Sequence, residues 1–172
     1  GSEHVTRDEF RNYTEFLARN RAVQAWEWIR AVPASERERF EQATRAEGLD
    51  GFEIWQNDAG GRRVPATDRQ MHYSVVRVMP EEGHRERLGF DLGSEPVRRA
   101  AIEEALRTGL ITATDPVTLV QETGSQKGIL VFRPVFADAQ RKAPRGLPVA
   151  VLGLGDALAA SGPDAVVAEE LL

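Results

Sequence analysis

The sequence contains no cysteine, and this absence removes several classes of site at once. Without cysteine the chain forms no disulfide, no thiolate zinc centre and no cysteine nucleophile. The sequence also has no excess of positive charge, because 22 Lys and Arg stand against 27 Asp and Glu, for a net charge of −5. Nucleic-acid-binding domains neutralise phosphates with a basic surface. Nucleic acid is therefore not an expected partner.

Long hydrophobic runs and catalytic signatures are missing as well. No run of roughly 18 apolar residues occurs that could span a bilayer. The chain begins Gly1-Ser2, which we interpret as the cleavage scar of an excised fragment, so any membrane contact is expected through flanking segments. There is no nucleophile elbow, phosphate-binding glycine loop or zinc-protease helix, and the three histidines are widely spaced. We predict no enzyme activity, no metal and no cofactor.

The first 32 residues carry a helical pattern. Between Glu3 and Val32 the apolar residues fall at steps of three, four and seven, and no Gly or Pro interrupts them before Pro33. We therefore expect a long N-terminal stalk helix over residues 1–32. Its first half either packs on its own domain, projects from it or pairs with a second copy to give a homodimer, and its second half, with Trp26 and Trp28, is expected to dock on the domain. A second helix is expected after Pro33, with Ser35 and Glu38 as a capping box.

The rest of the chain alternates between strands and one further helix. Strands are predicted at Tyr73–Met79, Val117–Gln121, 129–136 and 147–152, with a polar loop over 122–128. A shorter strand is expected at 52–56, and a helix is predicted from Ser94 to about Thr108, closed by Gly109. This order indicates an α+β fold with a PAS-like antiparallel sheet. We assign residues 33–153 to this core and residues 154–172 to a C-terminal helix.

Several motifs in this order resemble the CHASE domain. They are Leu88-Gly89-Phe90-Asp91-Leu92-Gly93-Ser94-Glu95-Pro96, then Ala113-Thr114-Asp115-Pro116, then Phe132-Arg133-Pro134-Val135-Phe136. The resemblance covers roughly residues 26–152. The central strand departs from it, because Tyr73-Ser74-Val75 stands where bacterial members often have Phe-Pro-Val, and this departure affects the identity of a ligand more than membership of the family.

The resemblance implies a function. CHASE domains lie outside the cytoplasm between two transmembrane helices, and they sense small molecules for histidine kinases or for diguanylate or adenylyl cyclases. It therefore implies a periplasmic domain of a bacterial inner-membrane receptor that passes a signal through its stalk helix. Plant cytokinin receptors belong to the same family. There the residue matching Asp91 binds an adenine-type ligand, and a backbone contact would fall on Ala113, just before Thr114.

The chemistry of two charged residues leaves alternatives open. Asp91 ends an apolar segment, so it must be solvated or hydrogen-bonded. It either accepts hydrogen bonds from a ligand or caps the following helix and local backbone. Arg77 is expected on one strand face with Tyr73, Val75 and Met79. There it either binds a carboxylate or phosphate, extends its charged end to the surface, or pairs with a neighbouring Glu. Asp91 alone suggests an amine or base, and both residues together suggest a zwitterion.

Other candidate residues have structural alternatives too. The chain before Pro116 is extended or turning, so backbone groups of Ala113 and Thr114 are either free for a ligand or part of a plain turn. Tyr73, Gln121 and Phe132 are candidate walls of the site, or simply core. The competing function is a protein-interaction or dimerisation module without a small ligand, which predicts a solid core behind Asp91.

Overall fold

The structure is a computed structural model that describes residues 23–121, 124–136 and 144–154. Seven strands form a large antiparallel sheet, in the order β4-β1-β9-β7-β5, with β6 paired to β7 and β8 to β9. A separate two-stranded ribbon joins β2 and β3. The elements are β1 Val23–Pro33, η2 Ala34–Glu36, α2 Arg37–Ala46, β2 Trp55–Asn57, β3 Arg63–Pro65, β4 Met71–Met79, η3 Arg85–Arg87, η4 Leu92–Ser94, α3 Pro96–Thr108, β5 Thr112–Ala113, β6 Val117–Gln121, β7 Gly124–Phe132, β8 Val135–Phe136 and β9 Pro144–Gly153.

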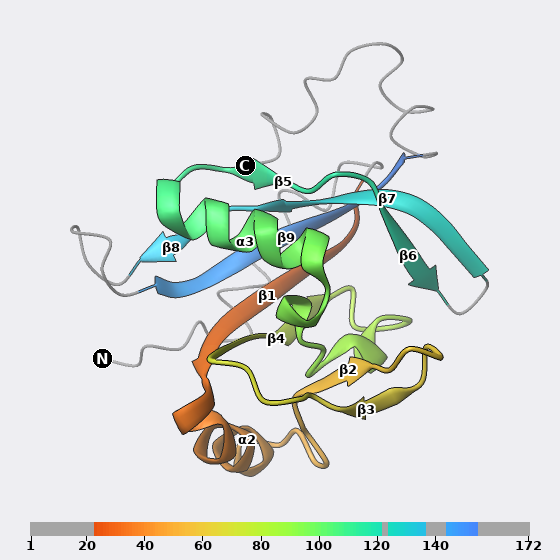
Figure 1. Ribbon diagram of the computed structural model, residues 1–172. Coiled ribbons are helices and arrows are strands. Elements are labelled where there is room, and N and C mark those ends of the chain that lie inside the picture. Colours follow the sequence, from red (N-terminus) through yellow and green to blue (C-terminus); the bar gives the residue numbers. More distant parts are fainter. Residues whose placement is uncertain (1–22, 122–123, 137–143, 155–172) are drawn as a thin grey trace.

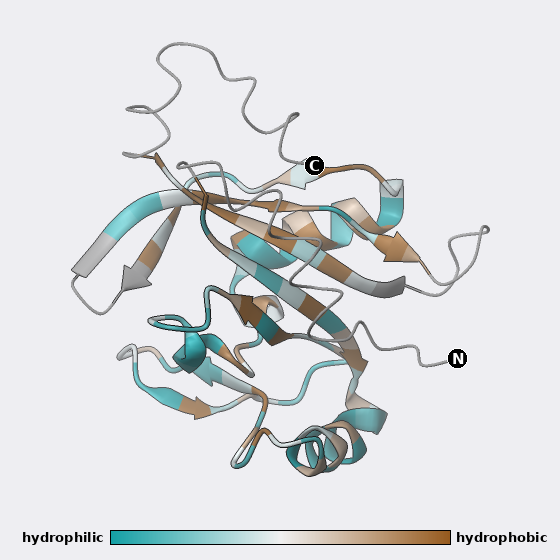
Figure 2. Ribbon diagram, turned by 180° about the vertical axis from the view of Figure 1, so that it is seen from behind, coloured by the Kyte–Doolittle hydropathy of each residue, from teal (hydrophilic) through white to brown (hydrophobic). Residues whose placement is uncertain are grey.

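This arrangement confirms the predicted α+β class with a mostly antiparallel sheet. Helix α3 lies across one face of the sheet, and α2 lies beyond the end of β1 (Figure 1). One apolar cluster packs between α3 and the sheet and includes Ile102, Phe132 and Leu147. A second cluster on the other side includes Trp26, Ile54 and Ala150. Hydrophobic residues accordingly run along the central strands (Figure 2).

The helix predicted over residues 1–32 is wrong at its C-terminal end. Residues 23–33 form β1, which lies between β4 and β9 in the middle of the sheet. Its central segment, Ala25–Ile29, is buried on both faces, so it is apolar except for Glu27 and has no clear alternation that would identify a strand. Pairing on both edges then decides the structure, whatever the local propensity. The rest of the predicted stalk, residues 1–22, lies outside the described residues, as does 155–172 of the predicted C-terminal helix.

The second helix begins later than its predicted cap. Ser35 lies in η2, and α2 begins at Arg37 with Glu36 as an N-cap that makes no side-chain hydrogen bond. The expected capping box is therefore wrong. The predictions for β4, β6, β9 and α3 are confirmed within a few residues. The predicted polar loop 122–128 is mostly strand, because β7 already begins at Gly124 and pairs with β6.

A β-bulge in β4 changes which residues share a face. The register passes from Trp28 opposite Arg77 to Ile29 opposite Val75, so Val76 is an extra residue in β4. Val75 belongs to the cluster beneath α3, whereas Val76 belongs to the second cluster, against which Met79 also packs. The prediction that Tyr73, Val75, Arg77 and Met79 lie on one face is therefore wrong. Strict alternation cannot reveal the bulge from sequence.

Within the part of the chain that the structure describes, every helix is too short or too polar to cross a membrane.

Candidate functional site

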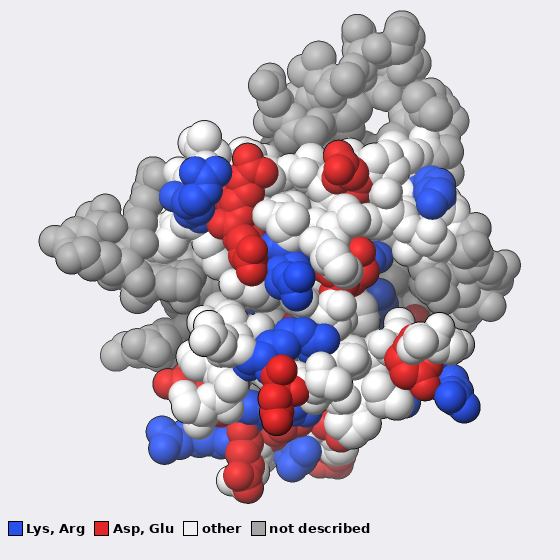
Figure 3. All heavy atoms as spheres, in the orientation of Figure 1, with Lys and Arg blue, Asp and Glu red and all other residues white. Residues whose placement is uncertain are grey.

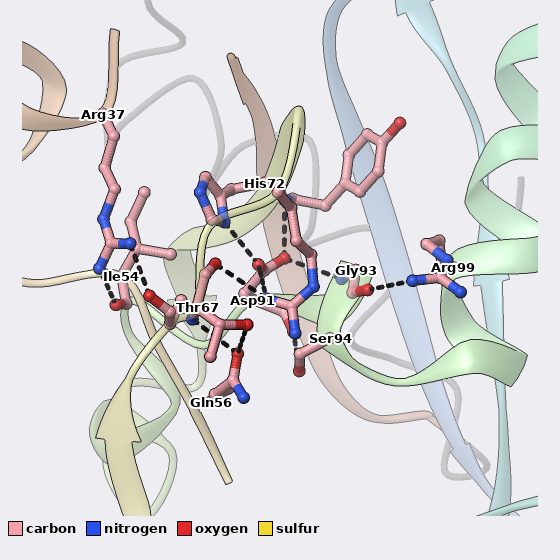
Figure 4. A network of polar contacts seen from close by, with 12 residues as sticks. Arg37, Ile54, Gln56, Thr67, His72, Asp91, Gly93, Ser94 and Arg99 are labelled. Carbon is pink, nitrogen blue, oxygen red and sulfur yellow. Dashed lines mark hydrogen bonds and ion pairs between the residues drawn. The ribbon is translucent and has the colours of Figure 1, made fainter. Parts of the chain in front are cut away.

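Asp91 is fully buried and holds three segments together. Its backbone N–H donates to the carbonyl of Trp55, the first residue of β2, and Asp91 bridges to Ser74 of β4. The carboxylate Oδ1 accepts the backbone N–H groups of Tyr73 at 2.9 Å and Gly93 at 2.8 Å. The Gly93 contact makes Asp91 the N-cap of η4. The Asp91 carboxylate therefore ties β4 to the segment that leads into α3 (Figure 4).

The second carboxylate oxygen of Asp91 also has partners from the chain. His72 Nδ1 lies 2.8 Å from Oδ2, and because an ionised carboxylate only accepts, this ring nitrogen donates. Arg69 Nη1 donates to the same oxygen at 3.3 Å. All four donors come from the protein, which favours the structural alternative for Asp91. A ligand could reach this carboxylate only by displacing a donor, and Arg69 makes the longest of these contacts.

The hydrogen bonds of Asp91 set the direction of its pKa. Burial alone would raise the pKa of this carboxyl, but the hydrogen bonds from His72 and from the backbone N–H groups of Tyr73 and Gly93 outweigh burial, and the pKa lies below 3.8. A carboxyl whose pKa is lower in the folded state stabilises the fold above its unfolded pKa, and this stability is lost as the pH falls through the folded value.

We therefore expect the free energy of unfolding to fall as the pH drops below about 4, with a share that belongs to Asp91. Urea unfolding at about pH 7 and about pH 3 measures this loss for the wild type and for Asp91→Asn, which does not titrate. The variant should start less stable and lose less on acidification. An equal loss in both proteins would contradict the assigned role of the Asp91 charge.

The remaining predicted site residues lie in different parts of the structure. Tyr73 and Phe132 are both buried in the cluster beneath α3. Burial, and then the charge of Glu103 on α3, raise the pKa of the Tyr73 hydroxyl. Ala113 and Phe132 lie in the β5–β7 pair at the edge of the sheet, and Gln121 ends β6 opposite Gly124.

The backbone predicted to be free near Pro116 is in use. Ala113 lies opposite Val131 in β5. Thr114 donates its backbone N–H to the Leu130 carbonyl at 2.9 Å, and its hydroxyl accepts the Leu130 N–H at 3.0 Å. The segment is thus strand followed by a bonded turn, which is the structural alternative for these two residues.

Arg77 lines a hollow of about 180 Å³ away from Asp91. The hollow lies between the loop that follows α2, residues 76–78 of β4 and residues from the 81–88 segment. Arg77 Nη1 donates to the carbonyl of Val76 at 2.8 Å, while its buried Nε has no partner among the described residues. None of the residues that bond the Asp91 carboxylate lines this hollow. Asp91 and Arg77 therefore do not form one site.

A group of buried and half-buried charges near the start of α3 was not predicted from the sequence. It is here named the α3 ion cluster: Glu27, Arg87, Glu95 and Arg98. Glu27 of β1 is 1% exposed and Arg98 of α3 is 8% exposed. Glu27 Oε2 accepts from Arg87 Nε at 3.4 Å, and Arg98 Nη1 donates to Glu95 Oε2 at 3.2 Å. Burial, and then the positive charge of Arg87, lower the pKa of Arg98.

Two atoms of the α3 ion cluster have no hydrogen-bond partner among the described residues: Glu27 Oε1 and Arg98 Nε. Buried polar atoms nearly always have a hydrogen-bond partner, so two buried atoms without one are uncommon in the same core. The signal for Glu27 was its position in the apolar run Ala25–Ile29, which indicates a buried carboxylate once that run is known to be a strand.

The described residues form an α+β domain, with a seven-stranded antiparallel sheet, a two-stranded ribbon, and ionisable side chains between the large sheet and the helix on its face. The family model for the CHASE domain matches residues 3–168, nearly the whole chain. The chain therefore belongs to the CHASE domain family. CHASE domains are extracytoplasmic sensor domains of membrane receptors, not catalytic domains. No curated protein matches the sequence.

Proposed function

We propose that this chain is the periplasmic ligand-sensing domain of a transmembrane receptor, and that it binds a small organic molecule between α3 and the large sheet. On this proposal the receptor's output is a histidine kinase or a diguanylate or adenylyl cyclase. Ligand binding favours one arrangement of the N-terminal stalk, which pairs with that of a second copy. A ligand shifts such an equilibrium only by its difference in affinity for the two arrangements.

The α3 ion cluster is the observation that carries the binding proposal. Removing charges from water costs several kcal/mol per ion, and replacing buried ion pairs with apolar residues is often neutral or stabilising. Each buried atom left without a partner costs a further ~1–3 kcal/mol. A core with a purely structural role would therefore gain little stability from Glu27 and Arg98. Perturbed, buried ionisable groups are typical of binding sites.

The residues predicted from sequence take supporting roles in this proposal. Tyr73 and Phe132 form apolar walls beneath α3, with Gln121, Ala113 and Thr114 toward the edge of the sheet. Asp91 holds the segment before α3 in place, and an amine or base reaches it only by replacing Arg69. Arg77 offers a separate position for an acidic group, with its unpaired Nε facing no acceptor among the described residues.

A metabolite screen by thermal shift tests the proposed function. At 100-fold its Kd, a specific ligand adds ~2.7 kcal/mol of stability, which for a domain of this size raises Tm by about 5–10 °C. We expect at least one small molecule to do this. Arg77→Gln is the control variant: it should keep the full shift if the ligand binds beneath α3, and should lose it if the ligand binds in the Arg77 hollow.

A screen in which no small molecule raises Tm would contradict the proposed function. It would favour the alternative, a protein-interaction or dimerisation module without a ligand.

A further inference from the structure

One oxygen atom of the buried Glu27 carboxylate has no hydrogen-bond donor among the described residues. It lies between Val78 of β4 and Val149 of β9, two residues of the apolar cluster beneath α3. Its one described contact, from Arg87 Nε to Oε2 at 3.4 Å, is long for a charge-assisted hydrogen bond, which usually measures about 2.7–2.9 Å. Oε1 has no described partner at all. The group that completes this carboxylate is a strong donor, and a cation fits best.

Arg98 has the opposite need, because one of its N–H donors has no acceptor among the described residues. Two of its nitrogen atoms are in use: Nη1 donates to Glu95 Oε2 at 3.2 Å, and Nη2 donates to the Thr118 carbonyl of β6 at 3.3 Å. These bonds fix the guanidinium between α3 and the sheet. The buried Nε–H is left without an acceptor. An acidic oxygen is the partner that a guanidinium N–H binds most strongly.

The charges of the α3 ion cluster balance, and this balance restricts the ligand. Glu27 and Glu95 offset Arg87 and Arg98, and Glu95 also accepts the first N–H groups of α3 from Val97 and Arg98. The charges of Arg87 and Glu27 both affect Arg98, so they act across one interface. A buried ligand with a net charge would leave that charge uncompensated, whereas a ligand that is neutral overall leaves the balance unchanged.

From these three observations we infer that the ligand is a small zwitterion whose ammonium group donates to Glu27 Oε1 and whose acidic group accepts from Arg98 Nε. This inference rests on the proposed function and specifies the chemical class of the ligand. Acidic and basic side chains also lie side by side over the face that carries α3 (Figure 3).

Arg87 is the member of the cluster best placed to admit the ligand. Its side chain is 24% exposed, against 2% for Glu27 and 10% for Arg98. Its guanidinium also lies over the ring of Phe90, at 4.8 Å from the centroid. Because its bond to Glu27 Oε2 is long, the Arg87 side chain can move aside to admit the ligand and then pair with Glu27 Oε2 again, so the charge balance is kept. The ammonium group then enters beside Glu27 while Arg87 stays on Phe90.

Blocked probes test the chemical class on the unaltered protein. The probes are the common α-amino acids and short ω-amino acids, measured by thermal shift and then by calorimetric titration. Each hit is compared with its methyl ester, which lacks the acid, and with its N-acetyl form, which lacks the ammonium group. We expect at least one zwitterion to bind, and both blocked forms to bind about tenfold more weakly or worse, since each loses one charged contact.

Variants test the placement. Glu27→Gln should weaken binding of the zwitterion about tenfold or more and leave the weak binding of the N-acetyl form unchanged. Arg98→Lys keeps the charge but removes Nε, and should leave the methyl ester unaffected. Glu104→Gln and Arg107→Gln, both exposed on α3, are matched controls that should bind like the wild type. Circular dichroism of each variant confirms that it is folded.

The outcomes separate this inference from the proposed function. If other metabolites raise Tm but no zwitterion does, the inferred class is wrong and the proposed function stands. Equal affinity of a zwitterion and its blocked forms would overturn the inference too, even if a variant fails to fold. If folded Glu27→Gln and Arg98→Lys bind the zwitterion normally, the placement is wrong. If no compound of any class binds, the proposed function itself fails.

Discussion

Replacement of Asp91 by alanine is expected to lower the free energy of unfolding by about 4 kcal/mol. The substitution leaves the backbone N–H groups of Tyr73 and Gly93 without their acceptor inside the protein. It also leaves His72 and Arg69 without their carboxylate. Removing one partner from a buried ion pair costs about 3–5 kcal/mol, and the unsatisfied donors add to that cost.

Urea and thermal unfolding measure the effect of Asp91→Ala, and a loss of this size lowers Tm by about 8–16 °C. Asp58→Ala is the matched control, because Asp58 also accepts two backbone N–H groups and one arginine, but in an exposed turn. The control should lose much less stability. Similar losses of stability in the two variants would show that the burial of Asp91 does not increase its contribution to stability.

Replacement of Gly89 by alanine should destabilise the domain by about 3 kcal/mol or more. Gly89 has φ +87°, and an added Cβ would overlap the backbone carbonyl oxygen of Glu53 and lie 3.0 Å from Trp55 Cδ1. The Gly89 N–H donates to the backbone carbonyl of Val75 at 2.8 Å, and the Gly89 carbonyl accepts the backbone N–H of Trp55 at 3.0 Å. Left-handed backbone costs an L-residue ~1–2 kcal/mol, and overpacking adds about 1–3 kcal/mol.

Gly83→Ala separates these two contributions. Gly83 has nearly the same φ, +78°, but an added Cβ would meet nothing within 4 Å. This variant should lose only the backbone share, about 1 kcal/mol. Chemical unfolding of both variants gives the comparison, and equal losses would mean that the close approach to Glu53 does not matter.

The hydrogen bonding of Asp91 was predictable because local chemistry specifies it. A carboxylate that ends an apolar segment must be solvated or hydrogen-bonded, and the structure gives it four donors. The helix at Pro96–Thr108 was predictable for the same reason, since Pro96 and Gly109 mark its ends. Such features depend on a few neighbouring residues, so they can be recognised without knowledge of the fold.

The α3 ion cluster was not predictable in this way. Glu27, Arg87 and Arg98 are far apart in the sequence and meet only because β1 is the second strand of the sheet, next to β4. Because residues 23–32 were predicted to be helical, Glu27 was not expected to lie buried in the core. The bulge at Val76 likewise depends on pairing with β1 and moved Arg77 away from the face predicted for it.

A crystal structure of the domain with a compound that raises its Tm tests the central claim most directly. The account predicts density for the compound beneath α3, with one polar end at Glu27 and the other at Arg98. Density confined to the Arg77 hollow or to the outer surface, with both orphaned atoms unchanged, would contradict it.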